Sequence, residues 1–404
     1  MRSSGILLHV TSLPQQGGIG TLGETAYRFV DFLKKSGMSI WQVLPVGPTG
    51  YGESPYQSGS TFAGNPLMID LVKLEETGLL EKGSFEPLPD SDKVDYEAVR
   101  WQKDQLLRRS FAYAYEKVKA DVDAYVASRE WLPDYALYAA LKKKFDLRSW
   151  MEWPDDVRLR REEALCAARE ELKEEIAFQC YVQYLFDLQW NELRDYAHAN
   201  GVKLFGDMPI YVAEDSADAW GHPENFQFNE DRRPTGVAGV PPDYFSQDGQ
   251  LWGNPLYAWD DMKEEGYSWW LKRLAAMGGG RNPHAPSQHK ENAIVYTGTH
   301  DNDTTLGWWR AASEEEQKKA RRMTHAKGEQ DIVISMIRTA MASVCDTAII
   351  PMQDILNLGT EARMNIPGTV GGNWAWRMTE LPNAKVAREL KALVKENHRE
   401  GKKK

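Results

Sequence analysis

The sequence predicts an α/β fold of the (β/α)-barrel type, and three observations support this. Five apolar stretches of strand length recur along the 404 residues. A helical stretch separates the first two of them, which is the spacing of a parallel βαβ unit. Polar or aromatic residues follow each stretch, and the carboxyl ends of barrel strands are where such proteins carry their chemistry.

The first three of the five predicted strands have distinctive features. The first two flank a helix over Glu24–Lys35, with Gly37 as its C-terminal cap. The third contains Asp207 among apolar neighbours, and a carboxylate there is seldom tolerated unless it is paired or used. The expected parallel strands are Ile6–Val10, Ile40–Val46, Val202–Val212, Ala293–Tyr296 and Thr347–Met352.

Long loops rich in glycine and aromatic residues follow several of these strands. The loop Gly47–Pro66 holds Tyr51, Tyr56 and Phe62. A loop of this length in a compact domain is either functional or disordered, and its aromatics argue against disorder. We interpret it as a binding loop. Residues 218–260, expected to have little regular structure, have a similar composition and should line the same face. Residues 368–377 form another loop rich in glycine and tryptophan.

The middle of the chain has a different, helical character. Its Glu- and Lys-rich sequence shows helical periodicity, and two further helices are expected later in the chain. We predict three parts: residues 1–66 as the first part of the barrel, 67–200 as an inserted helical subdomain, and 201–404 as the rest of the barrel. The expected helices are Trp101–Lys117, Tyr135–Lys144, Arg161–His198, Glu264–Ala276 and Ser313–Ala342.

The densest polar cluster follows the fourth predicted strand. It reads Thr299, His300, Asp301, Asn302, Asp303. Asp and Asn are also ordinary turn and helix-cap residues, but a cap needs only one of them. We therefore interpret the cluster as part of a functional site.

Composition excludes several classes of partner. The net charge of −10 comes without a basic stripe, which argues against nucleic acid and against an anionic membrane. No metal-ligand spacing or phosphate loop is present, so no cofactor is expected. Three scattered cysteines (Cys166, Cys180, Cys345) and the lack of a signal peptide or membrane span predict a cytoplasmic protein. Fifteen Trp and 17 Tyr suit stacking on sugar rings, although core packing explains them equally well.

Longer motifs then make a resemblance specific. The chain resembles the 4-α-glucanotransferases of the amylomaltase (disproportionating enzyme) family, glycoside hydrolase family 77. The matching stretches cover both ends and most of the middle: His9–Pro14, Tyr51–Pro66, Phe205–Val212, Gly239–Tyr257, Thr297–Thr305, Gln353–Thr369 and Gly371–Arg377.

The resemblance implies transfer of α-1,4-glucan segments between maltooligosaccharides through a covalent glucosyl-enzyme intermediate. It implies that Asp301 stabilises the transition state and that His300 binds hydroxyls beside it. Tyr56 would stack on the sugar in the donor subsite, and Asp207 would lie near the cleavage point. The remaining residues implied to bind substrate are Asp243, Tyr244, Phe245, Trp252 and Asn365.

One departure from the family pattern bears on activity. The family nucleophile is the Asp of a motif RIDHFRG and the acid/base is the Glu of a motif EDLG, and this sequence contains neither. About three βα units are missing near residues 277–282, which predicts an incomplete barrel with a gap after the third strand. Three interpretations follow: a transferase of this family, a glucan-binding remnant without turnover, or, less favoured, an α-amylase-type hydrolase.

Overall fold

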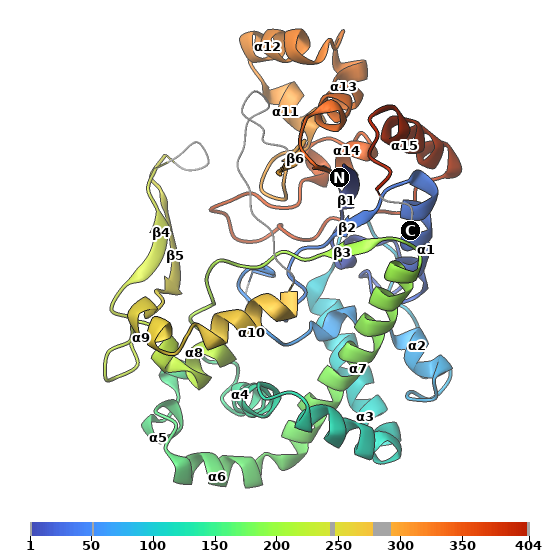
Figure 1. Cartoon of the computed structure of the whole chain (residues 1–404). Helices are drawn as coiled ribbons and strands as arrows, with labels where there is room; N and C mark the ends of the chain where they lie inside the picture. The colour runs from blue at the N-terminus through green and yellow to red at the C-terminus, as the bar shows by residue number, and fades with distance from the viewer. Residues whose placement is uncertain (1, 51, 243–246, 278–291, 402–404) are drawn as a thin grey trace.

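The central element is one parallel sheet of five strands (Figure 1). The computed structural model describes residues 2–50, 52–242, 247–277 and 292–401. Within these residues the strand order is β3-β2-β1-β7-β6, and every neighbouring pair is parallel. The strands are β1 (Ser3–Leu7), β2 (Ile40–Gln42), β3 (Lys203–Phe205), β6 (Ile294–Tyr296) and β7 (Thr347–Pro351).

The sheet is open, as predicted. A closed barrel of the usual kind needs eight tilted strands, whereas the described part of the chain supplies five, with β3 and β6 at the two edges. Although β3 and β6 lie at opposite edges, they follow one another in chain order among the strands of this sheet, so the gap comes after the third strand. The segment around residues 277–282, where the missing units were expected, lies largely outside the described residues.

Three predicted strands are wrong in extent. The second, β2, ends at Gln42 and not at Val46. The third ends at Phe205, not at Val212, because the chain leaves the sheet at Gly206, and Pro209 cannot donate a ladder hydrogen bond. The first begins at Ser3, where it pairs with Thr347, and ends at Leu7. It is followed by a 3-10 turn, η1 (Val10–Ser12).

Helix α1 (Glu24–Ser36) follows β1 and confirms the first predicted βαβ unit. Its end is set by Gly37, whose φ of 74° is left-handed and whose N–H bonds back to Leu33 and Lys34. The apolar face of α1 buries Phe29, whose ring meets the edge of Trp41 on β2 at 4.9 Å.

Long helices fill residues 67–200, which form the lower part of Figure 1. Helix α3 is longer than the predicted Trp101–Lys117, and the single predicted helix Arg161–His198 is divided at Leu172 into α6 and α7. The elements are η2 (Pro66–Met68), α2 (Leu71–Glu76), α3 (Tyr96–Ala127), α4 (Leu132–Lys144), η3 (Trp150–Glu152), α5 (Asp155–Arg158), α6 (Glu162–Glu171) and α7 (Lys173–Ala199). The proposed domain boundaries at 66 and 200 remain a prediction.

Residues 218–260 carry more regular structure than expected. A two-stranded antiparallel sheet, β4 (Val237–Val240) with β5 (Gln250–Pro255), lies between short helices. The predicted helix Glu264–Ala276 is interrupted at Gly266 and Tyr267, both with positive φ. The helices are α8 (Ala217–Gly221), η4 (Pro223–Asn225), α9 (Trp259–Glu264) and α10 (Ser268–Met277).

The last third surrounds β6 and β7. The predicted helix Ser313–Ala342 is two helices, because His325 adopts the left-handed conformation that ends the first of them. Helix α15 packs against α1 beside the sheet (Figure 1). The elements are α11 (Thr305–Ala311), α12 (Glu314–Thr324), α13 (Glu329–Ala342), α14 (Met352–Ile355), η6 (Thr360–Ala362) and α15 (Ala384–Glu396).

Candidate active site

The four residues expected to converge on one cleft come together at the carboxyl edge of the sheet. Tyr56 lies in the loop after β2, Asp207 follows β3, and His300 and Asp301 follow β6. The Tyr56 hydroxyl donates to Asp207 Oδ2 at 2.6 Å, and its oxygen lies 3.2 Å from His300 Nδ1. Loops that are far apart in the sequence therefore meet at one cluster of side chains.

Aromatic rings form one side of this cluster. The rings of Tyr56 and His300 stack with centroids 4.8 Å apart and an interplanar angle of 21°. Trp374, from the loop before α15, lies 5.8 Å from Tyr56 and 5.7 Å from His300. Flat rings gathered beside carboxylates present both apolar faces and hydrogen-bond acceptors, the combination that a sugar ring requires.

Asp301 is held by several donors. Its Oδ1 accepts from Asn365 Nδ2 at 2.7 Å, and its Oδ2 lies 3.3 Å from His300 Nε2. Arg363 donates to the Asp301 backbone carbonyl at 2.7 Å. Burial alone would raise the pKa of Asp301, but His300, Asn365 and Arg363 outweigh it and lower that pKa. Asp301 therefore carries a negative charge at neutral pH.

The pKa of Tyr56 is shifted in the opposite direction, so its hydroxyl stays protonated. Burial of the hydroxyl raises its pKa well above the usual value, and Asp207 and Asp301 raise it further. The phenol is thus a fixed donor to Asp207. The Asp207 carboxylate gains a charge-assisted hydrogen bond, which is stronger than one between neutral groups.

The other polar residues of the Thr299–Asp303 cluster are structural. The Asn302 side chain accepts from the backbone N–H of Thr299 at 2.9 Å, and Asp303 Oδ2 accepts from Thr360 at 2.8 Å. The functional interpretation of the cluster thus concerns His300 and Asp301, whereas Asn302 and Asp303 shape the loop that carries them.

Asp354, which the sequence did not single out, supports the same loop. Its side chain is 2% exposed and accepts hydrogen bonds from Thr297 Oγ1 at 2.5 Å, Thr305 N at 2.8 Å and Thr305 Oγ1 at 2.7 Å. It ties β7 to both ends of the β6 loop. Its place directly after a strand in Gln353–Asp354 was the available signal.

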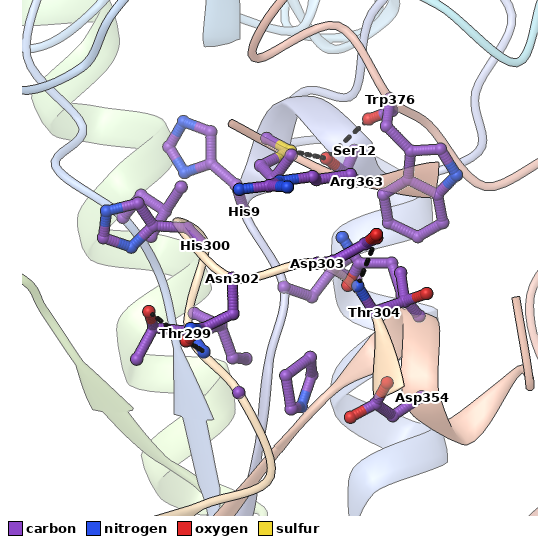
Figure 2. Close-up of a pocket in the computed structure, with 17 residues that line it drawn as sticks. His9, Ser12, Thr299, His300, Asn302, Asp303, Thr304, Asp354, Arg363 and Trp376 are labelled. Carbon is purple, nitrogen blue, oxygen red and sulfur yellow. Dashed lines mark hydrogen bonds between the residues drawn. The ribbon is translucent and has the colours of Figure 1, made fainter. Parts of the chain in front are cut away.

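His9 is a second residue that the sequence did not single out. It lies just after β1 and lines a cavity of about 30 Å³ together with His300 and Asp354 (Figure 2). Its ring is 6% exposed, and Nδ1 has no hydrogen-bond partner within the described parts of the chain. Burial, with a smaller effect from His300, lowers the pKa of His9 to about 3, so the imidazole is neutral.

The expected acceptor loop is described only in part. Trp252 lies on β5, is 39% exposed, and meets the edge of Tyr211 at 6.2 Å. Tyr211 lines a second small cavity together with Tyr56. Asp243, Tyr244 and Phe245 lie outside the described residues.

The structure also bears on metals and membranes. Among the residues described, no group of three or more His, Cys, Asp or Glu side chains is placed to hold a metal ion. The helices in the described ranges include none long and apolar enough to cross a membrane.

The fold and the site define a barrel-type carbohydrate-active protein, and comparison with known proteins identifies the family. A family model described as 4-alpha-glucanotransferase matches residues 8–279 and 275–382. The chain belongs to the 4-alpha-glucanotransferase family.

Individual relatives agree. The 4-alpha-glucanotransferase of Thermus thermophilus is 39% identical over 477 positions, covering 93% of this chain and 95% of that protein. That of Streptococcus pneumoniae serotype 4 is 37% identical, covering 94% of each. An amylomaltase from Streptococcus agalactiae, solved in complex with acarbose, superposes with a TM-score of 0.92 at 32% identity, covering 99% of this chain and 100% of that one.

The alignment with the Thermus thermophilus protein shows a difference in length. It runs over 477 positions while this chain has 404 residues, so at least 73 positions of the Thermus protein have no counterpart here. The family model matches in two pieces that meet at residues 275–279, next to the gap between β3 and β6. The incomplete barrel and the absent motifs thus have one origin.

Proposed function

We propose that this chain binds α-1,4-glucans and maltooligosaccharides and acts in 4-α-glucan transfer. The observation that carries the proposal is the junction of Tyr56, Asp207, His300 and Asp301 in one cluster. It lies at the carboxyl edge of the sheet, in a chain of the 4-alpha-glucanotransferase family.

Each residue of the cluster has a proposed role. Asp301, ionised and held by Asn365, stabilises positive charge that develops at the anomeric carbon. His300 binds a sugar hydroxyl beside it. Tyr56 offers its ring to the donor sugar, and Asp207 accepts from a sugar hydroxyl with the oxygen that Tyr56 leaves free.

Further residues are assigned to substrate on weaker grounds. Trp252 offers an exposed ring on the acceptor side. Asn365 touches Asp301 directly, so its effect on substrate is exerted at least in part through that carboxylate. Asp243, Tyr244 and Phe245 are proposed as acceptor-side residues from their motif alone.

Retaining transfer makes a further chemical demand. It requires a nucleophilic carboxylate and an acid/base carboxyl about 5 Å apart on opposite sides of the scissile bond. The motifs that supply both in the family are absent from this sequence. The second candidate, glucan binding without turnover, rests on this absence alone, whereas the family match over residues 8–279 and 275–382 favours transfer.

One experiment separates the two candidates. The purified chain is assayed for disproportionation of maltotriose and titrated with maltoheptaose. A matched chimera carries, after Met277, the unmatched residues of the Thermus thermophilus protein. Products longer than maltotriose from the chain itself support transfer. Binding without products, with activity in the chimera, supports the second candidate. Neither binding nor products would refute the proposal.

We also propose a cytoplasmic location. Cys166, Cys180 and Cys345 are all free thiols, as a reducing compartment favours. Fractionation of cells that produce the protein would test this, and recovery in the secreted fraction would contradict it.

A further inference from the structure

His9 is a buried side chain at the carboxyl edge of the sheet. Its ring is 6% exposed, and Nδ1 is buried without a hydrogen-bond partner in the described ranges. Buried polar atoms are nearly always satisfied, and leaving one unpaired is costly. The His9 side chain also lines a cavity, so a group that enters this cavity lies against the ring.

The cavity beside His9 adjoins the proposed glucan site, because His300 belongs to both. It lies at the carboxyl ends of β1, β6 and β7, and His300 is part of its lining (Figure 2). Its volume of about 30 Å³ admits one or two water-sized groups and no sugar ring. The group that fits is therefore small and polar.

The charged residues around the cavity further restrict which small polar group can bind there. Asp303 and Asp354 belong to the lining, which disfavours a small anion despite Arg363 on the same wall. A neutral imidazole has one donor and one acceptor nitrogen. A hydroxyl group is likewise both donor and acceptor, so it can satisfy the ring without changing its charge.

We propose that His9 is a further substrate-binding residue, which hydrogen-bonds a hydroxyl of the glucan projecting from the ring that stacks on Tyr56. The assignment rests on the proposed function of the site. His9 would contact the sugar from the segment directly after β1, while Tyr56 and Asp301 contact it from the loops after β2 and β6. The contact would be neutral and would complement the charged contact of Asp301.

Two substitutions at the same position test the assignment. His9→Phe keeps a ring and removes both nitrogens, and His9→Asn keeps polar atoms near the place of Nδ1. Maltoheptaose titration should give a Kd roughly two- to tenfold higher for His9→Phe, the range of one neutral hydrogen bond, and a smaller increase for His9→Asn. His198→Phe, an exposed histidine of α7, is the matched control and should leave the Kd unchanged.

The ring nitrogens of His9 give an independent readout. Their ¹⁵N resonances should shift on addition of maltoheptaose. Resonances that stay in place would mean that only water satisfies the ring, which would overturn the assignment. An unchanged Kd for a folded His9→Phe variant would do the same while leaving the proposed function intact. Failure of the unmodified chain to bind maltoheptaose would instead overturn the proposed function, and the assignment with it.

Discussion

The buried His9 should make the folded protein sensitive to acid in a way that one substitution removes. The pKa of His9 falls from 6.5 to about 3 on folding, chiefly through burial. Between these values the unfolded chain binds a proton that the folded chain does not. Stability linked to His9 is therefore fully present above pH 6.5 and is lost as the pH falls toward 3.

The size of the effect at pH 5 follows from the same values. At pH 5 the unfolded chain is 1.5 pH units below the His9 pKa of 6.5, so its imidazole is protonated. Each unit corresponds to about 1.36 kcal/mol, so His9 lowers the free energy of unfolding by about 2 kcal/mol at this pH. At pH 7 the effect is only a few tenths of a kcal/mol. The folded pKa need only lie well below 5 for this result to hold.

Urea unfolding at pH 7, 6 and 5 measures the effect, with refolding checked for reversibility. The His9→Phe variant should lose about 2 kcal/mol less between pH 7 and pH 5 than the unmodified chain. Any packing change caused by Phe is independent of pH and cancels in this comparison. The His198→Phe control should follow the unmodified chain. Parallel pH profiles for His9→Phe and the unmodified chain would refute the buried neutral imidazole.

Three further substitutions test the site. Tyr56→Ala should weaken maltoheptaose binding roughly two- to tenfold through loss of a stacking face, with Tyr56→Phe less affected; equal Kd values in titration would remove Tyr56 from the donor site. In the chimera, Asp301→Asn should slow maltotriose disproportionation by roughly 10²-fold or more, and a near-normal rate would exclude the charge-stabilising role. Asp354→Asn should lower the free energy of unfolding by about 1–3 kcal/mol, because the amide cannot accept all three hydrogen bonds; Asp260→Asn on the surface is the control, and equal urea midpoints would contradict the role of Asp354.

The sheet could be predicted from the sequence because its apolar strands are short and sharply bounded. Ile294–Tyr296 ends at Thr297-Gly298 in both prediction and structure. The prediction extends the third strand too far because apolar residues continue to Val212, although Pro209, Tyr211 and Val212 line a small cavity after the strand has ended. Helix breaks at Leu172 and His325 escaped prediction because neither residue is a Gly or Pro, which are the signals that usually mark an end.

Site residues could be predicted where a sequence motif contains them, but not where only their packing distinguishes them. Tyr56, Asp207, His300 and Asp301 each stand in a recognisable stretch, and their meeting follows from strands that share an edge. His9 begins the matching stretch His9–Pro14, but a histidine after an apolar strand has no pattern that distinguishes a packed ring from a ligand. Only its burial beside a cavity, with an unpaired nitrogen, separates the two.

The geometry of the open sheet explains how glucan binding and turnover can be separable in this chain. β1 is the central strand, with β2 and β3 on one side and β7 and β6 on the other. Contacts of the cluster join the two sides of β1, because Tyr56 follows β2 and contacts His300, which follows β6. Asp301 is in turn held by Asn365, from the segment after β7. None of these contacts passes through the gap between β3 and β6, so the binding groups keep their positions without it. The two carboxyls that the chemistry demands belong, in the family, to motifs that this chain lacks, which is why restoring that segment should change the rate far more than the affinity.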